Sequence, residues 1–309
     1  MNRAGEGLPP GVQIAFHDDM TEPKLRRAAE RSVATLLAHS ADAVARARAA
    51  EARRSELVAA LNAPVAKLIE ADAAAVKALD ELRTEHLFDV RPTDALNVAT
   101  PYDPNTVSLR VALRAPVQVR VPPYDFAWSW SNGNAPFNQV LVNATGRVGL
   151  DARSGSMPGG ASGFVEAHAG FGLILSTSRT VTVTGRSFRR MKYSYEVRAV
   201  GVGGNATSEG GMEFTALEDG RLVASASEKL WRHRVSATYS SGFDEHGAGG
   251  EGPYAVTEPR ELVFTMNPGH EYTFNVGIWV FTDRSTGAGA AAAQSLLQGN
   301  VLAITVERP

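Results

Sequence analysis

The chain has 309 residues, 31 Lys and Arg against 33 Asp and Glu, and no cysteine. The charge is spread evenly, with 12 basic and 14 acidic groups in residues 1–90, which argues against a nucleic-acid binder. The lack of cysteine excludes disulfides, thiolate metal sites and a cysteine nucleophile.

No stretch of the sequence has the pattern of a secretion signal or the apolar length of a membrane span. We therefore expect a soluble, cytoplasmic protein, and we leave open export by a non-classical route or release as part of an assembly. The seven histidines are scattered, so we also expect no metal, nucleotide or other cofactor.

The composition changes twice along the chain and predicts three parts. Residues 1–19 are rich in Gly and Pro and then short and apolar, which is typical of an extended arm. Residues 20–90 are predicted to be α-helical, and residues 91–309 are predicted to form a β-sandwich domain.

The helical prediction depends on residues 20–86, which contain no Phe, Tyr or Trp and are rich in Ala, Leu, Arg and Glu. Steps of four and three residues trace a heptad seam that is apolar at both ends and polar in the middle: Val33, Leu37, Ser40, Val44, Ala47, Glu51, Arg54, Val58, Leu61, Val65, Leu68, Asp72, Ala75, Leu79 and Leu82. Such a seam needs a partner face. We therefore expect self-association through residues 22–86 into an oligomer of unstated number.

Pro64 interrupts this seam, because proline inside a helix removes a hydrogen bond and clashes with the preceding turn. Two arrangements remain open. The register is unbroken across Pro64, which favours a kinked rod, whereas the need to bury apolar faces within one chain favours a helical hairpin that reverses at Asn62–Ala63.

After Phe88 the apolar residues recur every second position, which predicts strands. About ten are expected: 107–121, 140–150, 165–175, 181–183, 191–199, 212–216, 231–239, 262–266, 272–280 and 302–306. Gly/Ser-rich loops are expected at 153–163, 201–211, 240–253 and 286–293, and a short helix at 288–297. Short connections and alternating faces predict a mainly β fold, an antiparallel two-sheet sandwich of jelly-roll type.

Four aromatic residues stand at even positions in a row, Tyr124, Phe126, Trp128 and Trp130. On an extended segment they would share one face, with Asp125 and Asn132 nearby as hydrogen-bond partners. The pattern is most typical of a strand that faces the sandwich core. The flanking prolines and the Asn/Gly run keep open a second interpretation, a binding face for a carbohydrate or another protein.

Two polar groups are alternative sites. Glu166 and His168 alternate with apolar residues, so they share one strand face and could bind a metal or act as an acid and a base, although an ordinary solvated face is the commoner interpretation. Asp244, Glu245 and His246 lie in a predicted Gly-rich loop, where a mobile acidic loop is commoner than a metal site.

No motif identifies a reaction. The sequence favours a non-catalytic assembly or recognition protein, in which the helical segment mediates self-association and the sandwich loops bind a protein or a carbohydrate. An enzyme on a jelly-roll scaffold, with Glu166 and His168 or residues 244–246 as working groups, is the alternative.

Overall fold

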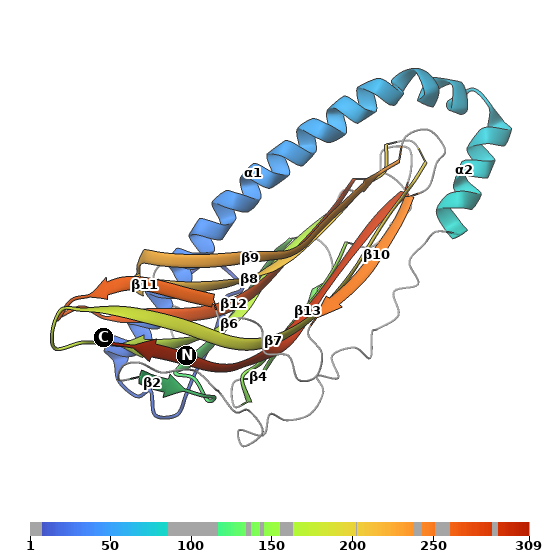
Figure 1. Cartoon of the computed structure of the whole chain (residues 1–309). Helices are drawn as coiled ribbons and strands as arrows, with labels where there is room; N and C mark the ends of the chain where they lie inside the picture. Colours follow the sequence, from blue (N-terminus) through green and yellow to red (C-terminus); the bar gives the residue numbers. More distant parts are fainter. Residues whose placement is uncertain are drawn as a thin grey trace.

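The computed structural model describes residues 8–85, 117–133, 137–142, 145–154, 163–201, 203–237, 243–250, 260–285 and 290–308. Figure 1 shows a long helix lying over a sandwich of two sheets with long strands. All strand pairings among these residues are antiparallel. The predicted antiparallel two-sheet sandwich is therefore confirmed, while the jelly-roll order of its connections stays a prediction.

The first sheet has six strands. Its spatial order is β1 (Gln13–Phe16), β3 (Phe126–Gly133), β6 (Gly163–Leu175), β12 (Tyr272–Ser285), β8 (Asn205–Glu218) and β9 (Arg221–Ser236). The predicted N-terminal arm thus supplies an edge strand of the sandwich, because β1 pairs with β3. A two-residue turn with positive φ at Asp219 and Gly220 joins β8 to β9.

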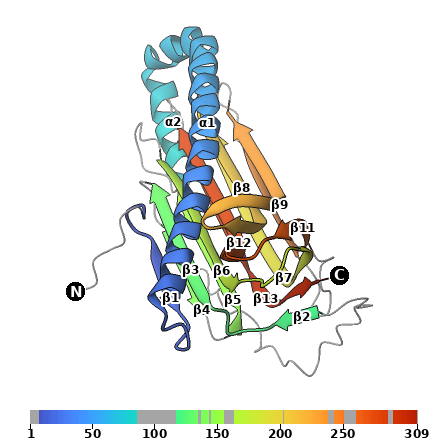
Figure 2. The ribbon, with the colours of Figure 1, turned by 90° about the vertical axis from the view of Figure 1, so that its left-hand side faces the viewer.

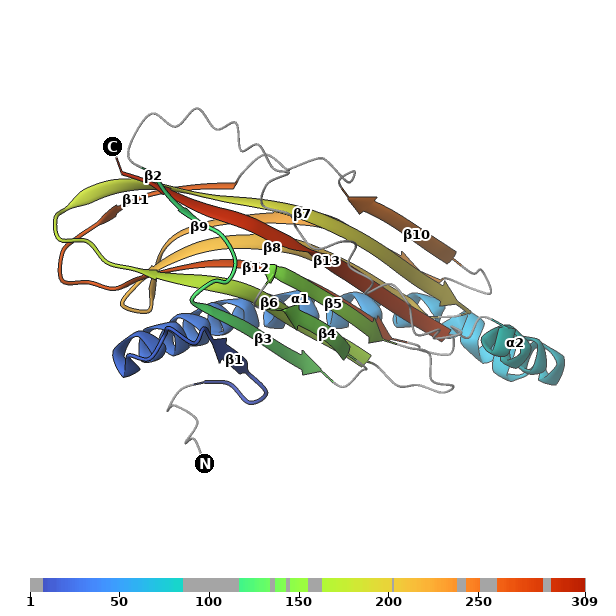
Figure 3. The ribbon, with the colours of Figure 1, turned by 90° about the horizontal axis from the view of Figure 1, so that it is seen from below.

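The second sheet has seven strands. Its main order is β10 (Phe243–Gly250), β7 (Val181–Val200), β13 (Ala290–Glu307), β5 (Arg147–Ser154) and β4 (Phe137–Val142), with β11 (Arg260–Met266) also paired to β7 and β2 (Val117–Arg120) to β13. Figure 3 shows this sheet in front, with the helix behind both sheets. The apolar core fills the space between the sheets with side chains such as Leu150, Phe171, Phe214 and Phe274.

Several predicted loops are strands in the structure. Of the segment expected to be a short helix, 288–297, the described residues 290–297 belong to β13. The strands β8 and β10 occupy parts of the expected loops 201–211 and 240–253. Gly and Ala have low strand propensity, but pairing with neighbouring strands overrides it here. Of the strand expected at 107–121, only β2 falls in the described residues.

The helical segment forms two helices, α1 (Pro23–Glu70) and α2 (Ala73–Glu85). The helix α1 continues through Pro64, as in the rod alternative, and the chain reverses at residues 71–72, so the hairpin alternative with its reversal at Asn62–Ala63 is wrong. Pro64 lies inside the last two turns of α1. Pro64 and Ala60 are exposed, so water can satisfy the carbonyl group of Ala60, which loses its partner. Asp72 begins α2 by accepting a hydrogen bond from the backbone N–H of Ala74 at 2.9 Å.

The helix α1 covers the outer face of the six-stranded sheet lengthwise (Figure 2). A second apolar cluster, separate from the core, joins Ala29, Val33 and Leu37 of α1 to Phe126 and Trp128 of β3. Glycine makes room for these rings: a Cβ at Gly172 would lie 2.0 Å from the ring of Phe126 on the neighbouring strand. Neither described helix combines the length and the apolar character needed to cross a bilayer.

Candidate functional site

The outward face of β6 carries two titratable side chains. Val165, Ala167 and Ala169 point into the core, so Glu166 and His168 point the other way, toward α1. Both side chains are buried because the helix lies over them. They are therefore neighbours on one strand face, as the sequence predicts, but that face is not solvated.

A serine of α1 completes this group. Ser40 occupies a polar position of the heptad seam, between Leu37 and Val44, and it lies directly above β6. Its Oγ donates a hydrogen bond to Oε1 of Glu166 at 2.6 Å and lies 2.9 Å from Nε2 of His168. The same nitrogen lies 2.9 Å from Oε1 of Glu166, so the three side chains form a closed triangle.

The triangle carries an unusual charge state. Burial works to lower the pKa of His168, but Glu166 at 2.9 Å and Glu213 at 3.8 Å outweigh it and raise the pKa from 6.5 to about 9. At neutral pH, His168 is therefore an imidazolium between two carboxylates. Ser40 and Glu166 complete its polar surroundings, so a buried charge is compensated as buried charges usually are.

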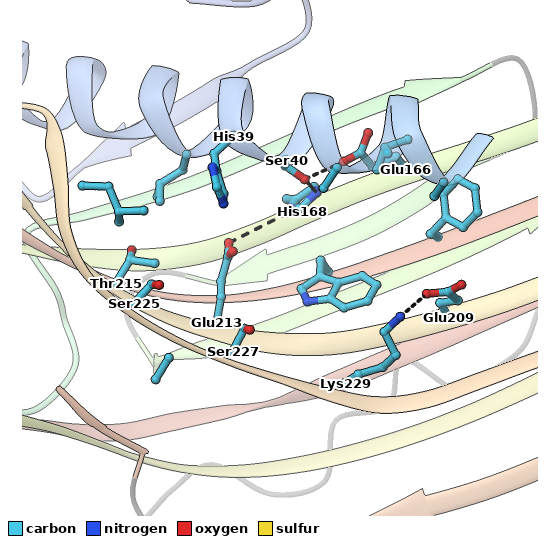
Figure 4. Close-up of a pocket in the computed structure, with 18 residues that line it drawn as sticks. His39, Ser40, Glu166, His168, Glu209, Glu213, Thr215, Ser225, Ser227 and Lys229 are labelled. Carbon is cyan, nitrogen blue, oxygen red and sulfur yellow. Dashed lines mark hydrogen bonds and ion pairs between the residues drawn. The ribbon is translucent and has the colours of Figure 1, made fainter. Parts of the chain in front are cut away.

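A cavity of about 330 Å³ opens beside the triangle, between α1 and the six-stranded sheet. Figure 4 shows its walls, with the helix on one side and β6, β8, β9 and β12 on the other. Its helix wall is formed by Leu36, His39, Ser40, Ala43, Val44 and Ala47. Its size and its mixture of apolar and polar walls are typical of small-molecule sites.

One side of the cavity is formed by Trp279 of β12. The ring has room because residue 211 on β8 is glycine: a Cβ there would lie 2.7 Å from the ring and 2.2 Å from the backbone oxygen of Glu228. The ammonium group of Lys229 lies 5.9 Å from the centre of the Trp279 ring and 2.6 Å from Oε2 of Glu209. This wall is thus an aromatic ring with the Lys229–Glu209 ion pair at its edge.

The charge state of the triangle bears on whether Ser40 could act as a nucleophile. A serine beside a histidine is the arrangement of an activated nucleophile, but the histidine must be neutral to accept the proton. Here His168 is protonated at neutral pH, and the Ser40 hydroxyl donates to Glu166. No group of three or more His, Asp or Glu placed to hold a metal ion occurs among the described residues.

A smaller polar pocket of about 180 Å³ lies further along α1. It is lined by Arg48, Glu51 and Ser55 of α1 and by Asp283 and Arg284 of β12, among others. Burial raises the pKa of Asp283 from 3.8 to about 6, with Arg48 opposing and Glu51 adding to the rise. This pocket lies where polar contacts attach the helix to the end of the sheet.

The aromatic row does not share one face. Tyr124 precedes β3 and lies in the core between the sheets, where its hydroxyl donates to the carbonyl of Val301 at 3.1 Å. Phe126, Trp128 and Trp130 are buried between β3 and α1, on the opposite side of the sheet. The period-two pattern extends only as far as the strand does, so it places three of the four rings together.

The polar neighbours of that row are also separated. The carboxylate of Asp125 accepts a hydrogen bond from the backbone N–H of Ile174 at 2.7 Å, and burial raises its pKa. Asn132 is exposed near the end of β3.

The second alternative site lies elsewhere in the fold. Asp244, Glu245 and His246 belong to β10, which pairs with β7 in the seven-stranded sheet. The expected loop at these residues is therefore a strand. It lies in the other sheet from Glu166 and His168, so the two alternative sites do not combine.

Sequence reasoning missed most of the residues that line the cavity, among them Ser40, Glu213, Lys229 and Trp279. Two signals were available. Ser40 interrupts an apolar seam, and Trp279 stands out of phase with the inward residues Ile278 and Val280 of its strand.

No protein-family model, no curated protein and no solved structure matches this chain.

Proposed function

We propose that this protein is a non-catalytic binding protein that holds a small molecule in the cavity between α1 and the six-stranded sheet. The observation that carries the proposal is the cavity itself, which combines an aromatic wall with the Ser40, Glu166 and His168 triangle. Ligand pockets of this kind combine apolar walls with a few polar groups that fix orientation.

The experiment compares small-molecule binding by the wild-type protein and by Ala43→Trp, in which a large side chain fills the cavity from α1. A fragment library is screened by saturation-transfer NMR. We expect a set of fragments that bind the wild type and not the variant. Ala45→Trp is the control, because Ala45 is exposed and does not line the cavity. A library whose binders are all unaffected by Ala43→Trp contradicts the proposal.

The second candidate is an enzyme on a jelly-roll scaffold, with Ser40 as nucleophile and His168 as base. The 2.9 Å distance between Ser40 Oγ and His168 Nε2 favours it. The raised pKa of His168 opposes it, because a general base works best with a pKa near the working pH. Hydrolysis of p-nitrophenyl acetate tests it. A rate in the wild type that falls to background in Ser40→Ala would support the enzyme in place of the binding protein.

We also propose that the distal end of the helical segment joins copies of the chain. Leu57, Leu61 and Leu68 are 60%, 77% and 72% exposed, and none of the described residues covers them. Leu61 and Leu68 belong to the heptad seam, and Leu57 lies beside it, next to the seam residue Val58. Exposed residues of both signs flank them, such as Arg53, Glu56 and Lys67, which suits a second copy in antiparallel contact.

A further inference from the structure

The charges around the cavity are unevenly distributed. Three carboxylates face it, those of Glu166, Glu209 and Glu213, whereas the side chains of Lys229 and the protonated His168 are its two cations. Lys229 forms an ion pair with Glu209 at 2.6 Å. Arg232, which does not line the cavity, forms a second ion pair with Glu209 at 2.9 Å. His168 is shared between Glu166 and Glu213. The part of the cavity beside β6 therefore has one more carboxylate than it has cations.

The carboxylate in excess is that of Glu213. Its nearest cation is Nδ1 of His168 at 3.8 Å, which is too long for a hydrogen bond. Its Oε1 is buried and has no hydrogen-bond partner among the described residues. By contrast, the carboxylate of Glu166 accepts from both Ser40 and His168. Oε1 of Glu213 is thus a buried acceptor of the cavity for which the described residues supply no donor.

Thr215 gives an independent indication of a polar ligand group. It follows Glu213 on the same face of β8, it lines the cavity, and it is only 4% exposed. Its Oγ1 is buried and has no hydrogen-bond partner in the part of the chain that the structure describes. Buried hydroxyl groups are usually paired, so a second unpaired polar group beside Glu213 points to a partner that binds there.

The strand next to β8 suits an apolar body. Trp279 of β12 lines the cavity from the sheet, and Leu36 and Val44 line it from α1. Aromatic faces attract cations as well as apolar groups, and this ring already has the Lys229 ammonium within 5.9 Å. One ligand could therefore contact both the carboxylate and the ring.

Resting on the binding function proposed above, we infer that the ligand is a small organic cation, an ammonium group on an apolar or aromatic body. The ammonium group donates hydrogen bonds to Glu213 and Thr215, and the body packs against Trp279. The excess carboxylate disfavours an anionic ligand, because two like charges in a partly buried cavity repel each other.

Three probes of one shape test the inference: 2-phenylethylammonium, the neutral 2-phenylethanol and the anionic 3-phenylpropionate. Binding of each to the wild type is measured by calorimetric titration at pH 7. We expect the ammonium probe to bind at least about tenfold more tightly than the alcohol, and the carboxylate probe more weakly than either.

The variant Glu213→Gln keeps the shape of the side chain and removes its charge. It should weaken binding of the ammonium probe by about tenfold and leave binding of the alcohol unchanged. Thr215→Val, which has nearly the same shape as threonine, should weaken binding of the ammonium probe by a few fold. Thermal melting of both variants establishes that they are folded, and Ala43→Trp establishes that each probe occupies the cavity.

The outcomes separate this inference from the function on which it rests. If the ammonium probe fails to bind, binds no better than the alcohol, or is unaffected by Glu213→Gln, the inference is overturned. If neutral fragments still lose binding in Ala43→Trp, the cavity remains a binding site for another class of ligand. If no fragment responds to Ala43→Trp, the proposed function itself fails.

Discussion

The two ends of α1 meet the rest of the molecule in different ways. The proximal part, residues 23–40, buries Ala29, Val33 and Leu37 against the rings of β3. The distal part, residues 51–70, is attached by polar contacts: Glu51 pairs with Arg234, and Arg54 donates to Ser236 at 3.1 Å. Beyond Ser55 its leucines are exposed.

The same heptad seam runs through both parts, so a periodic apolar face identifies a surface that needs covering and does not identify what covers it. In the proximal part the cover is the sheet of the same chain. The cavity lies between the two parts, where the seam turns polar at Ser40. The difference can be tested by changes that act on one part and not on the other.

The largest effect on stability is expected in the proximal part. Trp128→Ala removes a fully buried ring between β3 and α1 and should lower the free energy of unfolding by about 3–5 kcal/mol, as measured by urea denaturation. Leu61→Ala is the control in the distal part, and it should change that free energy by less than about 0.5 kcal/mol. Equal losses in the free energy of unfolding for the two variants would contradict the difference between the proximal and distal parts of α1.

The pH dependence of stability tests the middle of α1. The pKa of His168 in the folded protein, about 9, lies above its ordinary value of 6.5, so its protonation stabilises the fold. This contribution is complete below pH 6.5 and is lost as the pH rises through 9, and it amounts to roughly 3 kcal/mol. Urea denaturation of the wild type and of His168→Gln between pH 6 and 10 measures it. A wild type with the same pH profile as the variant would contradict the prediction.

A smaller effect of pH on stability is expected at Asp283, beside the distal part of α1. Burial raises its folded pKa to about 6 from 3.8, so the folded state favours the protonated carboxyl, and the free energy of unfolding should rise as the pH falls from 6 toward 4. Asp283→Asn should therefore stabilise the protein by about 1 kcal/mol at pH 7.5. The gain should shrink as the pH falls from 6 toward 4, and a gain that stays the same over this range would show that charge is not its cause.

The least change in stability is expected from the exposed seam. Replacing Leu57, Leu61 and Leu68 together by Glu should convert an oligomer to a monomer in light scattering at micromolar concentration. The free energy of unfolding of each subunit should change by less than about 0.5 kcal/mol per substitution. Ala49→Glu, on an exposed part of α1, is the control. A wild-type protein that is already a monomer would contradict self-association.

The sequence predicted the classes of structure well because periodicity is a local property. The helix, the antiparallel sandwich and the shared face of Glu166 and His168 all follow from it. The strands in Gly- and Ala-rich segments could not be predicted in this way, since β10 and β13 exist through their pairing with β7.

The candidate site was predicted only in part, because it joins three distant segments. Ser40 lies 126 residues before Glu166 in the chain, and Glu213 comes from another strand. No local pattern contains that juxtaposition. It arises because α1 crosses the outer face of the sheet at a fixed place, which the rings of β3 determine.

The contact between α1 and the β8–β9 turn has a consequence for biosynthesis. Thr35 donates a hydrogen bond to the carbonyl of Gly220, 185 residues further along the chain. At typical rates of translation, that interval takes roughly 10–40 s to synthesise. During this time the apolar side of α1 has left the ribosome, while much of the sheet that will cover it has not been made. The nascent protein therefore presents a long amphipathic helix to chaperones, and to neighbouring nascent chains, before its own sheet can compete for it.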